Sequence, residues 1–284
     1  MRHTLGGPTM GASYSAAFYA APGFDAAAVA AALFAAVDTV DRQMSNWTPH
    51  SDLNRLCAAP PGDWVDLPAP LLAVLEAGLQ VGRASGGAFD MAVADLVAAW
   101  GFGPPVRMPD PARIRALTGE RHIAAEQGVE LDPAAGRARR LAQVRLDLSG
   151  IAKGFGVDAM ADCLRAHGIT DFVVGIDGEL RASGYKPGGL PWTVAIEQPV
   201  PGAARGVIGH LDLVNRAIAT SGDYRNQIVL GDTRLSHTMD PASMRPLQNG
   251  VASVSVLAES CMMADAWATA LMVMGARAGA EFAR

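Results

Sequence analysis

Cysteine is scarce in this sequence, which has only three among 284 residues: Cys57, Cys163 and Cys261. They lie far apart, so the chain lacks the closely spaced cysteine pairs that hold zinc or exchange disulfides. Because three is an odd number, they cannot all pair with one another. We expect small, buried, free thiols that take no part in the chemistry of the protein.

Long apolar runs and basic clusters are also missing. The alanine-rich stretch 26–37 is bounded by Asp25 and Asp38, and no stretch approaches the ~20 apolar residues that span a membrane. The net charge is only −5, and no Lys/Arg cluster is flanked by aromatic residues. Such a surface is a poor ligand for nucleic acid. We therefore expect a chain that neither spans a membrane itself nor binds nucleic acid.

No export signal is visible near the start of the sequence. Residues 1–8 are followed by no apolar segment, and no small-residue cleavage site precedes a cysteine. The chain as it stands therefore predicts a cytoplasmic protein. A signal lost from the sequence would change that expectation, so the compartment stays open at this stage.

The composition is that of a folded protein. Half of the residues are apolar and 18% are charged, whereas disordered chains have fewer apolar and more charged residues. A length of 284 residues suits one large domain or two closely packed lobes. We therefore treat residues 1–284 as a single domain, with two lobes as the alternative.

The pattern of apolar residues predicts a mixture of helices and strands. Helical spacing, start signals and stop signals predict helices at residues 26–44, 68–83, 90–100, 111–117, 149–167 and 260–274. Short apolar runs separated by turn residues predict strands at 10–21, 122–125, 141–148, 172–176, 180–183, 192–196, 207–213, 217–220, 227–230 and 251–258. This order favours an α+β fold in which mostly antiparallel sheets pack against helices.

Two oxygen-bearing side chains stand out on the predicted closing helix. Asp265 and Thr269 are four residues apart, so they project from one face among largely apolar neighbours. Hard oxygen ligands suit Mg²⁺, which usually keeps water or substrate phosphate in its remaining positions. The alternative is that both residues make ordinary hydrogen bonds on the helix surface.

A possible phosphate-binding turn lies at residues 146–154. A predicted strand there runs into Ser149 and Gly150 and then into a helix, with Lys153 one turn along. Free N–H groups at a helix start attract phosphate oxygens, and Lys153 adds positive charge. Asp147 could accept hydrogen bonds from a ligand. The alternative is a tight strand–helix turn with a solvated lysine.

Four further features are individually weaker. His237 could bind phosphate or transfer a proton near neutral pH. The glycine turn at residues 86–90 would let a ligand approach the backbone. Trp47 could stack on an adenine or a flavin. The segment 219–224 offers several hydroxyl groups. Each also has a structural reading: a structural histidine, a simple turn, a surface-packed tryptophan and a hairpin corner.

The order of these motifs along the chain is more specific than any one of them. From about Met10 to Gly275, the sequence resembles the ApbE-like family of FAD:protein FMN transferases. The motifs that carry the resemblance are Thr9-Met10-Gly11, Met44-Ser45, Ser51-Asp52-Leu53, Gly87-Ala88-Phe89-Asp90, Trp100-Gly101-Phe102-Gly103, Asp147 to Gly154, Ser221-Gly222-Asp223-Tyr224, Ser236-His237, Asp240-Pro241, Ala264-Asp265-Ala266 and Thr269-Ala270.

The resemblance implies a T-fold-like arrangement of layers and a set of site residues. It implies Mg²⁺ held by the Gly150 carbonyl and by the side chains of Asp265 and Thr269. It implies FAD contacts from Met10, Trp47, Ala88, Phe89, Asp90, Asp147, Lys153, His237, Thr238 and Met239. It also implies that His237 lies near the phosphates.

The activity implied by the resemblance is transfer of the FMN half of FAD to a protein. A Ser or Thr hydroxyl of an acceptor flavoprotein would attack the FMN-side phosphorus, and AMP would leave. Asp147 or His237 would take or relay the proton, and the sequence does not choose between them. Acceptors in the family are membrane redox subunits, such as those of ion-pumping quinone reductases and nitrous-oxide regulators, and many relatives are exported.

Two other activities are compatible with the same residues. Attack by water would make the site an FAD pyrophosphatase, and loss of chemistry would leave a non-catalytic FAD-binding protein. Three departures from the family pattern keep these alternatives open: Ala12 replaces a usual threonine, residues 91–93 replace a usual Pro-Thr-Val, and residues 243–246 lack a usual glycine. Because the predicted metal and phosphate residues are retained, transfer is the leading interpretation.

Overall fold

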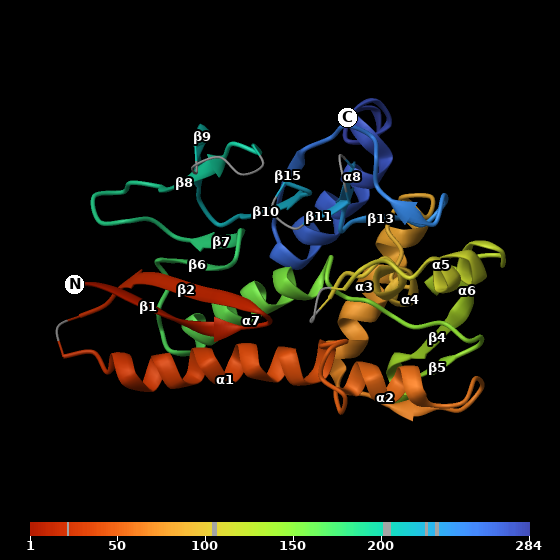
Figure 1. Ribbon diagram of the computed structural model, residues 1–284. Helices are drawn as coiled ribbons and strands as arrows, with labels where there is room; N and C mark the ends of the chain where they lie inside the picture. Colours follow the sequence, from red (N-terminus) through yellow and green to blue (C-terminus); the bar gives the residue numbers. More distant parts are fainter. Residues whose placement is uncertain (22, 104–106, 201–205, 225–226, 231–232) are drawn as a thin grey trace. The chain divides into compact units, whose positions relative to one another are not determined.

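The computed structural model describes residues 1–21, 23–103, 107–200, 206–224, 227–230 and 233–284. It has the expected α+β architecture, with mostly antiparallel sheets and packed helices (Figure 1). Its contacts divide the chain into two compact units. Unit 1 contains residues 1–41, 151–220 and 255–268, and unit 2 contains residues 42–150, 221–254 and 269–284.

Unit 1 is built on a six-stranded sheet with the order β1-β2-β6-β7-β10-β15. The strands are β1 (Arg2–Thr9), β2 (Ala12–Tyr19), β6 (Phe172–Ile176), β7 (Glu179–Ser183), β10 (Ala217–Gly222) and β15 (Ser253–Ala258). The pairs from β1 to β10 are antiparallel. A separate antiparallel pair consists of β8 (Trp192–Glu197) and β9 (Val207–Leu213).

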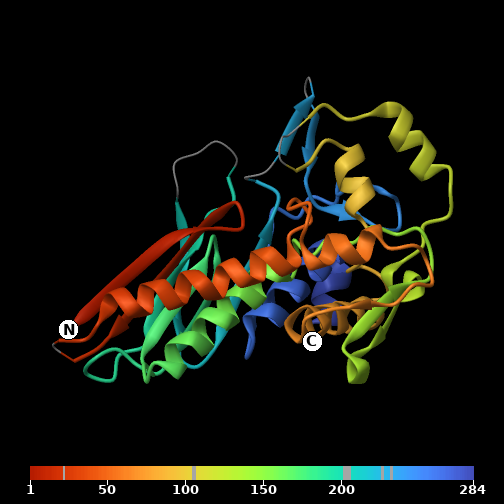
Figure 2. The ribbon, with the colours of Figure 1, turned by 90° about the horizontal axis from the view of Figure 1, so that it is seen from below.

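Two helices cover one face of this sheet. In both views, α1 (Ala26–Met44) and α7 (Ala152–Ala166) run along the same side of the strands (Figures 1 and 2). Their apolar positions recur every three or four residues, so one side of each helix is buried. Leu33 of α1 and Met160 of α7 meet Phe18 and Phe172 of the sheet in one fully buried core.

Unit 1 confirms most of the elements predicted for it. The helix at residues 26–44 and the strands at 172–176 and 207–213 have the predicted bounds. The predicted opening strand at 10–21 was wrong at its start, because Met10 and Gly11 form a hairpin turn with φ of 47° and 70°. The strand before that turn, β1, was not predicted, since its Leu-Gly-Gly-Pro run is not typical of a strand.

Unit 2 combines short helices with small sheets. The helices are α2 (Asp52–Ala58), α3 (Ala69–Ala84), α4 (Ala94–Ala99), α5 (Pro111–Thr118), α6 (Ala125–Gly128) and the 3₁₀ turn η1 (Pro133–Ala135). One sheet has the order β3-β5-β4, from β3 (Val65–Asp66), β5 (Arg137–Arg140) and β4 (Val129–Asp132). Two further strand pairs are β11 (Gln227–Leu230) with β12 (Thr233–Ser236), and β13 (Met239–Asp240) with β14 (Arg245–Pro246).

The strands predicted at residues 122–125 and 141–148 were wrong, because the structure places β4 and β5 between them. The charged run of β5 is stable as a strand because its half-buried arginines have partners. Arg137 and Arg139 lie over the ring of Trp64, at 4.6 and 4.5 Å from its centroid. They also pair with carboxylates of Asp132 and Glu130 on β4. Cross-strand pairs of this kind cannot be seen in the spacing of apolar residues.

Three helix boundaries also differ from the prediction. The helix predicted at residues 90–100 is reduced to α4, and the one predicted from residue 149 begins at Ala152. The closing helix, α8 (Cys261–Phe282), continues past the predicted end at residue 274 but is kinked at Gly275, where φ is 82° and ψ is 171°. Asp265 and Thr269 therefore both lie before the kink in α8.

The three cysteines are free, as predicted. Cys261 is buried, whereas Cys57 and Cys163 are only half-buried, so the expectation of burial holds fully for one of them.

Candidate functional site

A buried group of charged side chains surrounds Asp265 in unit 1. Asp265 is 4% exposed and Glu179 of β7 is 2% exposed. The Lys153 ammonium, at the start of α7, lies 2.8 Å from Glu179 Oε1 and 3.7 Å from Asp177 Oδ2. The Gly154 N–H donates to Asp265 Oδ2 at 2.9 Å. The predicted metal ligand and the predicted phosphate-binding lysine therefore belong to one cluster.

The electrostatics of this cluster favour a bound cation. Burial, and then the nearby Glu179 carboxylate, raise the pKa of Asp265 to about 7, against the opposing effects of Lys153 and the Gly154 N–H. Burial lowers the pKa of Lys153, but the carboxylates of Glu179 and Asp265 outweigh it, so that pKa lies above its ordinary value. Lys153 thus stays cationic, while Asp265 carries a charge that its surroundings stabilise poorly.

Unit 2 contains the other two predicted metal ligands, Gly150 and Thr269. A Cβ atom on Gly150 would lie 3.0 Å from Thr269 Oγ1 and 3.3 Å from the ring of Phe89, so the backbone passes close to that hydroxyl. Ser221 Oγ lies 3.0 Å from Thr269 Oγ1. A second hydroxyl therefore joins the predicted pair.

The donor atoms of the three predicted metal ligands, Gly150, Asp265 and Thr269, are all oxygens. Among the described residues, no three His, Cys, Asp or Glu side chains gather as a metal site. The predicted set has a different make-up, since it consists of one carboxylate, one hydroxyl and one main-chain carbonyl. Asp265 and Thr269 are one turn apart in α8. Such hard donors fit Mg²⁺, which leaves several positions to water and phosphate.

The two candidate proton acceptors, Asp147 and His237, lie in unit 2. Asp147 is 8% exposed, and its Oδ1 accepts the Ser149 N–H at 2.8 Å. The half-buried His237 has its ring centroid 6.5 Å from that of Phe102, in an edge-on arrangement. Burial raises the pKa of Asp223, and the nearby His237 partly opposes that shift. Asp147 is thus oriented by a backbone hydrogen bond, and the His237 ring lies against an aromatic ring.

The Gly87–Asp90 turn is held by side-chain hydrogen bonds. The Ser85 hydroxyl accepts the Phe89 N–H at 3.0 Å. Asp90 Oδ1 accepts the N–H groups of Ala92 and Ala125, each at 2.9 Å, and its Oδ2 lies 2.6 Å from Nε2 of His122. A pocket is lined by residues from α3, from this turn and from residues 124–126. The Asp90 carboxylate is therefore occupied within the protein, which leaves the backbone of the turn for a ligand.

We expect Asp90→Ala to lower the free energy of unfolding by about 2 kcal/mol, because it leaves two amides without their acceptor. Asp90→Asn keeps an acceptor oxygen for those amides and should cost much less. Urea unfolding of both variants measures the difference. Equal stability of the alanine variant and the parent would contradict this structural role.

The other predicted FAD contacts have varied surroundings. Trp47 is 43% exposed and packs over Gly103. Met10 packs against the core of unit 1, with its sulfur near Gly156 of α7. Met239 is 5% exposed in a small core of unit 2. Ala88 and Thr238 are half-buried. Of these residues, Trp47 is the one that is exposed, and stacking requires an accessible aromatic ring.

Comparison with known proteins then identifies the relationship. The family model described as "ApbE family" matches residues 10–284. The chain belongs to the ApbE family. One relative, the FAD:protein FMN transferase of Vibrio cholerae, is 37% identical over 97% of this chain and 82% of its own length. The protein of the same name from Escherichia coli K12 is 32% identical over 99% of this chain and 80% of its own length.

Solved structures of ApbE proteins share this fold. The flavin transferase ApbE from Vibrio cholerae superposes with a TM-score of 0.87, at 34% identity, over all of this chain and 90% of that one. The apo form of the Pseudomonas stutzeri flavinyl transferase ApbE gives 0.86, at 34% identity, over all of this chain and 88% of that one. The resemblance inferred from the motifs is therefore confirmed.

Two residues that contact predicted site residues, Glu179 and Ser221, were not themselves among the predictions. Glu179 follows a turn at residues 177–178, where its burial beside Lys153 gives no sequence signal. Ser221 lies in the hydroxyl-rich segment 219–224, where the sequence alone assigns no role to this residue.

Among the described residues, no helix has both the length and the apolar character to cross a membrane.

Proposed function

We propose that this chain is an FAD:protein FMN transferase that uses Mg²⁺. The observation that carries the proposal is the buried Asp265 beside Lys153, one turn from Thr269 in α8 of an ApbE-family protein. The named relatives are FAD:protein FMN transferases. A buried carboxylate with a raised pKa and a neighbouring ammonium suit a site for a cation and a phosphate.

In this proposal, the Gly150 carbonyl, the Asp265 carboxylate and the Thr269 hydroxyl would hold the metal. Their oxygen donors support the choice of Mg²⁺. Bound there, Mg²⁺ would supply positive charge to the non-bridging phosphate oxygens of FAD, where charge builds up as the phosphoanhydride breaks. Ser221 hydrogen-bonds to Thr269 and so would fix the direction of its hydroxyl.

The FAD contacts are assigned by chemistry. Lys153 and the N–H groups at the start of α7, apart from that of Gly154, which donates to Asp265, would bind phosphate oxygens. Trp47 would stack on an aromatic ring of FAD. The backbone of the Ala88–Asp90 turn would line the ligand. Met10, Asp147, His237, Thr238 and Met239 complete the proposed set.

The reaction forms one P–O bond and breaks another. The hydroxyl oxygen of a Ser or Thr in the acceptor attacks the FMN-side phosphorus, and the bridging oxygen leaves with AMP. Asp147 or His237 accepts the hydroxyl proton as the new bond forms. Holding the hydroxyl in line with the leaving oxygen supplies much of the acceleration.

We propose a flavoprotein subunit of a membrane redox complex as the acceptor. The relatives' name requires a protein acceptor, and a Ser or Thr hydroxyl is the nucleophile that gives a stable phosphoester. The second candidate function is FAD pyrophosphatase, which needs the same site and replaces the hydroxyl by water. A protein that only binds FAD is the third.

The test uses mass spectrometry of an acceptor peptide after incubation with FAD and Mg²⁺. The peptide carries the Ser/Thr motif of an ion-pumping quinone reductase subunit, and the control peptide has valine or alanine in place of the hydroxyl residue. We expect a mass gain equal to an FMN phosphoester on the first peptide alone. AMP release that is equally fast without peptide would favour the pyrophosphatase. FAD that stays intact in every reaction would favour the binding protein.

A further inference from the structure

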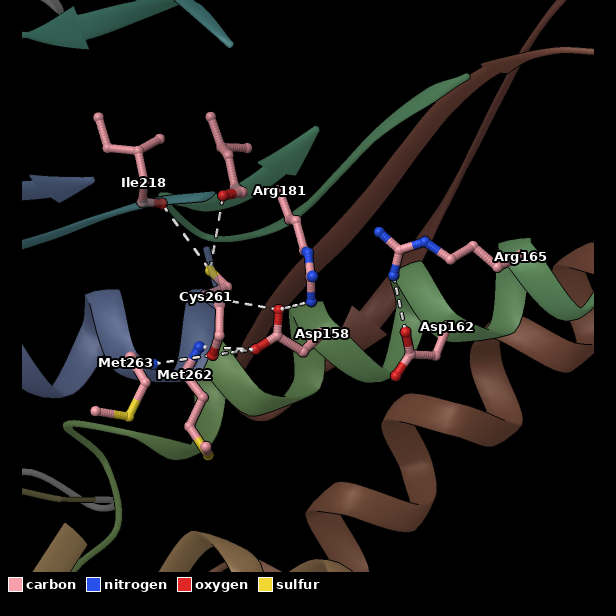
Figure 3. Close-up of polar contacts among 10 residues, drawn as sticks. Asp158, Asp162, Arg165, Arg181, Ile218, Cys261, Met262 and Met263 are labelled. Atoms are coloured by element: carbon pink, nitrogen blue, oxygen red, sulfur yellow. Dashed lines mark hydrogen bonds and ion pairs between the residues drawn. The ribbon is translucent and has the colours of Figure 1, made fainter. Parts of the chain in front are cut away.

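A second carboxylate, Asp158 of α7, contacts the first turn of α8 (Figure 3). Its Oδ1 accepts the Cys261 N–H at 3.0 Å, and its Oδ2 accepts the Met262 N–H at 2.9 Å. The Ser260 hydroxyl donates to Oδ2 at 2.9 Å, and Arg181 of β7 pairs with Oδ1 at 2.5 Å. Four groups from two elements therefore converge on one side chain that is only 13% exposed.

These contacts provide hydrogen-bond acceptors for N–H groups at the start of α8. The first N–H groups of an α-helix have no partner within the helix, and the helix dipole places partial positive charge there. Asp158 supplies a negative acceptor for two of these groups from outside α8. Ser260 Oγ accepts a third, the Met263 N–H, at 3.2 Å. The direction of the first turn of α8 is thus fixed by a charge-assisted network.

Asp158 and Gly154 are four residues apart in α7, so they lie on one face of it. Their partners, Cys261 and Asp265, are four residues apart in α8. A Cβ atom on Gly154 would lie 2.3 Å from the Cys261 carbonyl oxygen, so the two helices approach closely at this point. Two contacts one turn apart set the register of α8 on α7.

We infer that Asp158 is a positioning residue for Asp265. By holding the first turn of α8 in register with α7, it places the Asp265 carboxylate where the Gly154 N–H, Lys153 and Glu179 meet it. Groups that orient a metal ligand typically change metal affinity 10- to 100-fold when they are removed. The inference rests on the proposed function, because it assigns Asp265 to the Mg²⁺ site.

The test measures Mg²⁺ affinity by titration calorimetry of the full chain with MgCl₂, independently of turnover. We expect Asp158→Asn to weaken Mg²⁺ binding about tenfold. Ser260→Ala removes one contact to Asp158 and should weaken Mg²⁺ binding by a smaller factor. This variant tests the inference if Asp158→Asn folds poorly. Asp25→Asn is the matched control, because Asp25 caps the start of α1 in the same unit through the Ala27 and Ala28 N–H groups.

Hydrogen exchange of the peptide covering residues 259–266 gives a second readout. Exchange should be faster there in Asp158→Asn than in the parent and unchanged in Asp25→Asn. Parent-like Mg²⁺ affinity in an Asp158→Asn protein with lowered thermal stability would overturn the inference, since Asp158 would then only stabilise the fold. A parent that binds Mg²⁺ but transfers no FMN would contradict the proposed function instead, and the affinity comparison would still test Asp158.

Discussion

Asp265→Asn should reduce Mg²⁺-dependent FMN transfer by about 1,000-fold or more while FAD still binds. The substitution replaces the carboxylate ligand of the proposed metal site by an amide. Loss of the charge stabilisation that a divalent ion gives to a phosphoryl transfer costs several kcal/mol, and each tenfold in rate corresponds to about 1.4 kcal/mol. FAD binding survives because Lys153 keeps its partner Glu179 at 2.8 Å and Trp47 is untouched. Transfer assays and FAD fluorescence titrations measure the two effects.

The same variant should be more stable than the parent at pH 8 when metal is absent. In the folded parent, burial and Glu179 raise the pKa of Asp265 to about 7, above its value of 3.8 in a free chain. The folded state therefore binds this proton more tightly than the unfolded state, so parent stability falls as the pH rises from about 4 to about 7. Asparagine has no such proton. The difference between the proteins should shrink towards pH 4.

Urea unfolding in EDTA at pH 5 and pH 8 checks this expectation. Added Mg²⁺ should stabilise the parent and not the variant, because only the parent binds it in the folded state. Asp162→Asn is the control: it removes a carboxylate from α7 that is 74% exposed and paired with Arg165. Unchanged transfer in Asp265→Asn would remove the metal assignment, and lower stability at pH 8 would contradict the account of its surroundings.

The fold class and most helices and strands could be predicted, because the spacing of apolar residues shows which face of each element is buried. The helix at residues 26–44 was predicted at its observed bounds, since its apolar residues return every three or four positions. Strand β5 could not be predicted in this way. Its arginines are stabilised by Trp64 and by carboxylates of β4, which are partners that only the fold brings together.

In the candidate site, too, some residues could be predicted from the sequence and others could not. Asp265 and Thr269 could be singled out because their spacing on one helix is visible in the sequence. Glu179 and Asp158 could not, because their roles depend on contacts with Lys153 and with the start of α8, which are distant in sequence. Asp90 is a predicted ligand contact, but the structure shows that its carboxylate already contacts His122 and accepts two backbone N–H groups. These contacts could not be predicted from the sequence either.

The close approach of α7 and α8 leads to the second large effect, expected for Gly154→Ala. In a helix interior, alanine is favoured over glycine by about 1 kcal/mol, so the substitution alone would stabilise α7. Here the new Cβ would lie 2.3 Å from the Cys261 carbonyl oxygen and 2.8 Å from Asp265 Cβ. A backbone carbonyl cannot swing aside as a long side chain can. Relief therefore requires the helices to separate, which breaks the Gly154–Asp265 hydrogen bond.

Overpacking of this kind costs about 1–3 kcal/mol, and the lost hydrogen bond to a carboxylate adds about 1.5–3 kcal/mol. These losses exceed the gain in helix propensity, so we expect a net destabilisation of about 1.5–5 kcal/mol and Mg²⁺ affinity lowered at least tenfold. Gly156→Ala is the control in the same helix. Its Cβ would meet Ile176 Cδ1 at 2.9 Å and Met10 Sδ at 3.5 Å, the ends of flexible side chains that can move. Calorimetry should find Gly156→Ala near the parent in Mg²⁺ affinity, and equal losses in both variants would show that helix spacing at Gly154 has no special part in the site.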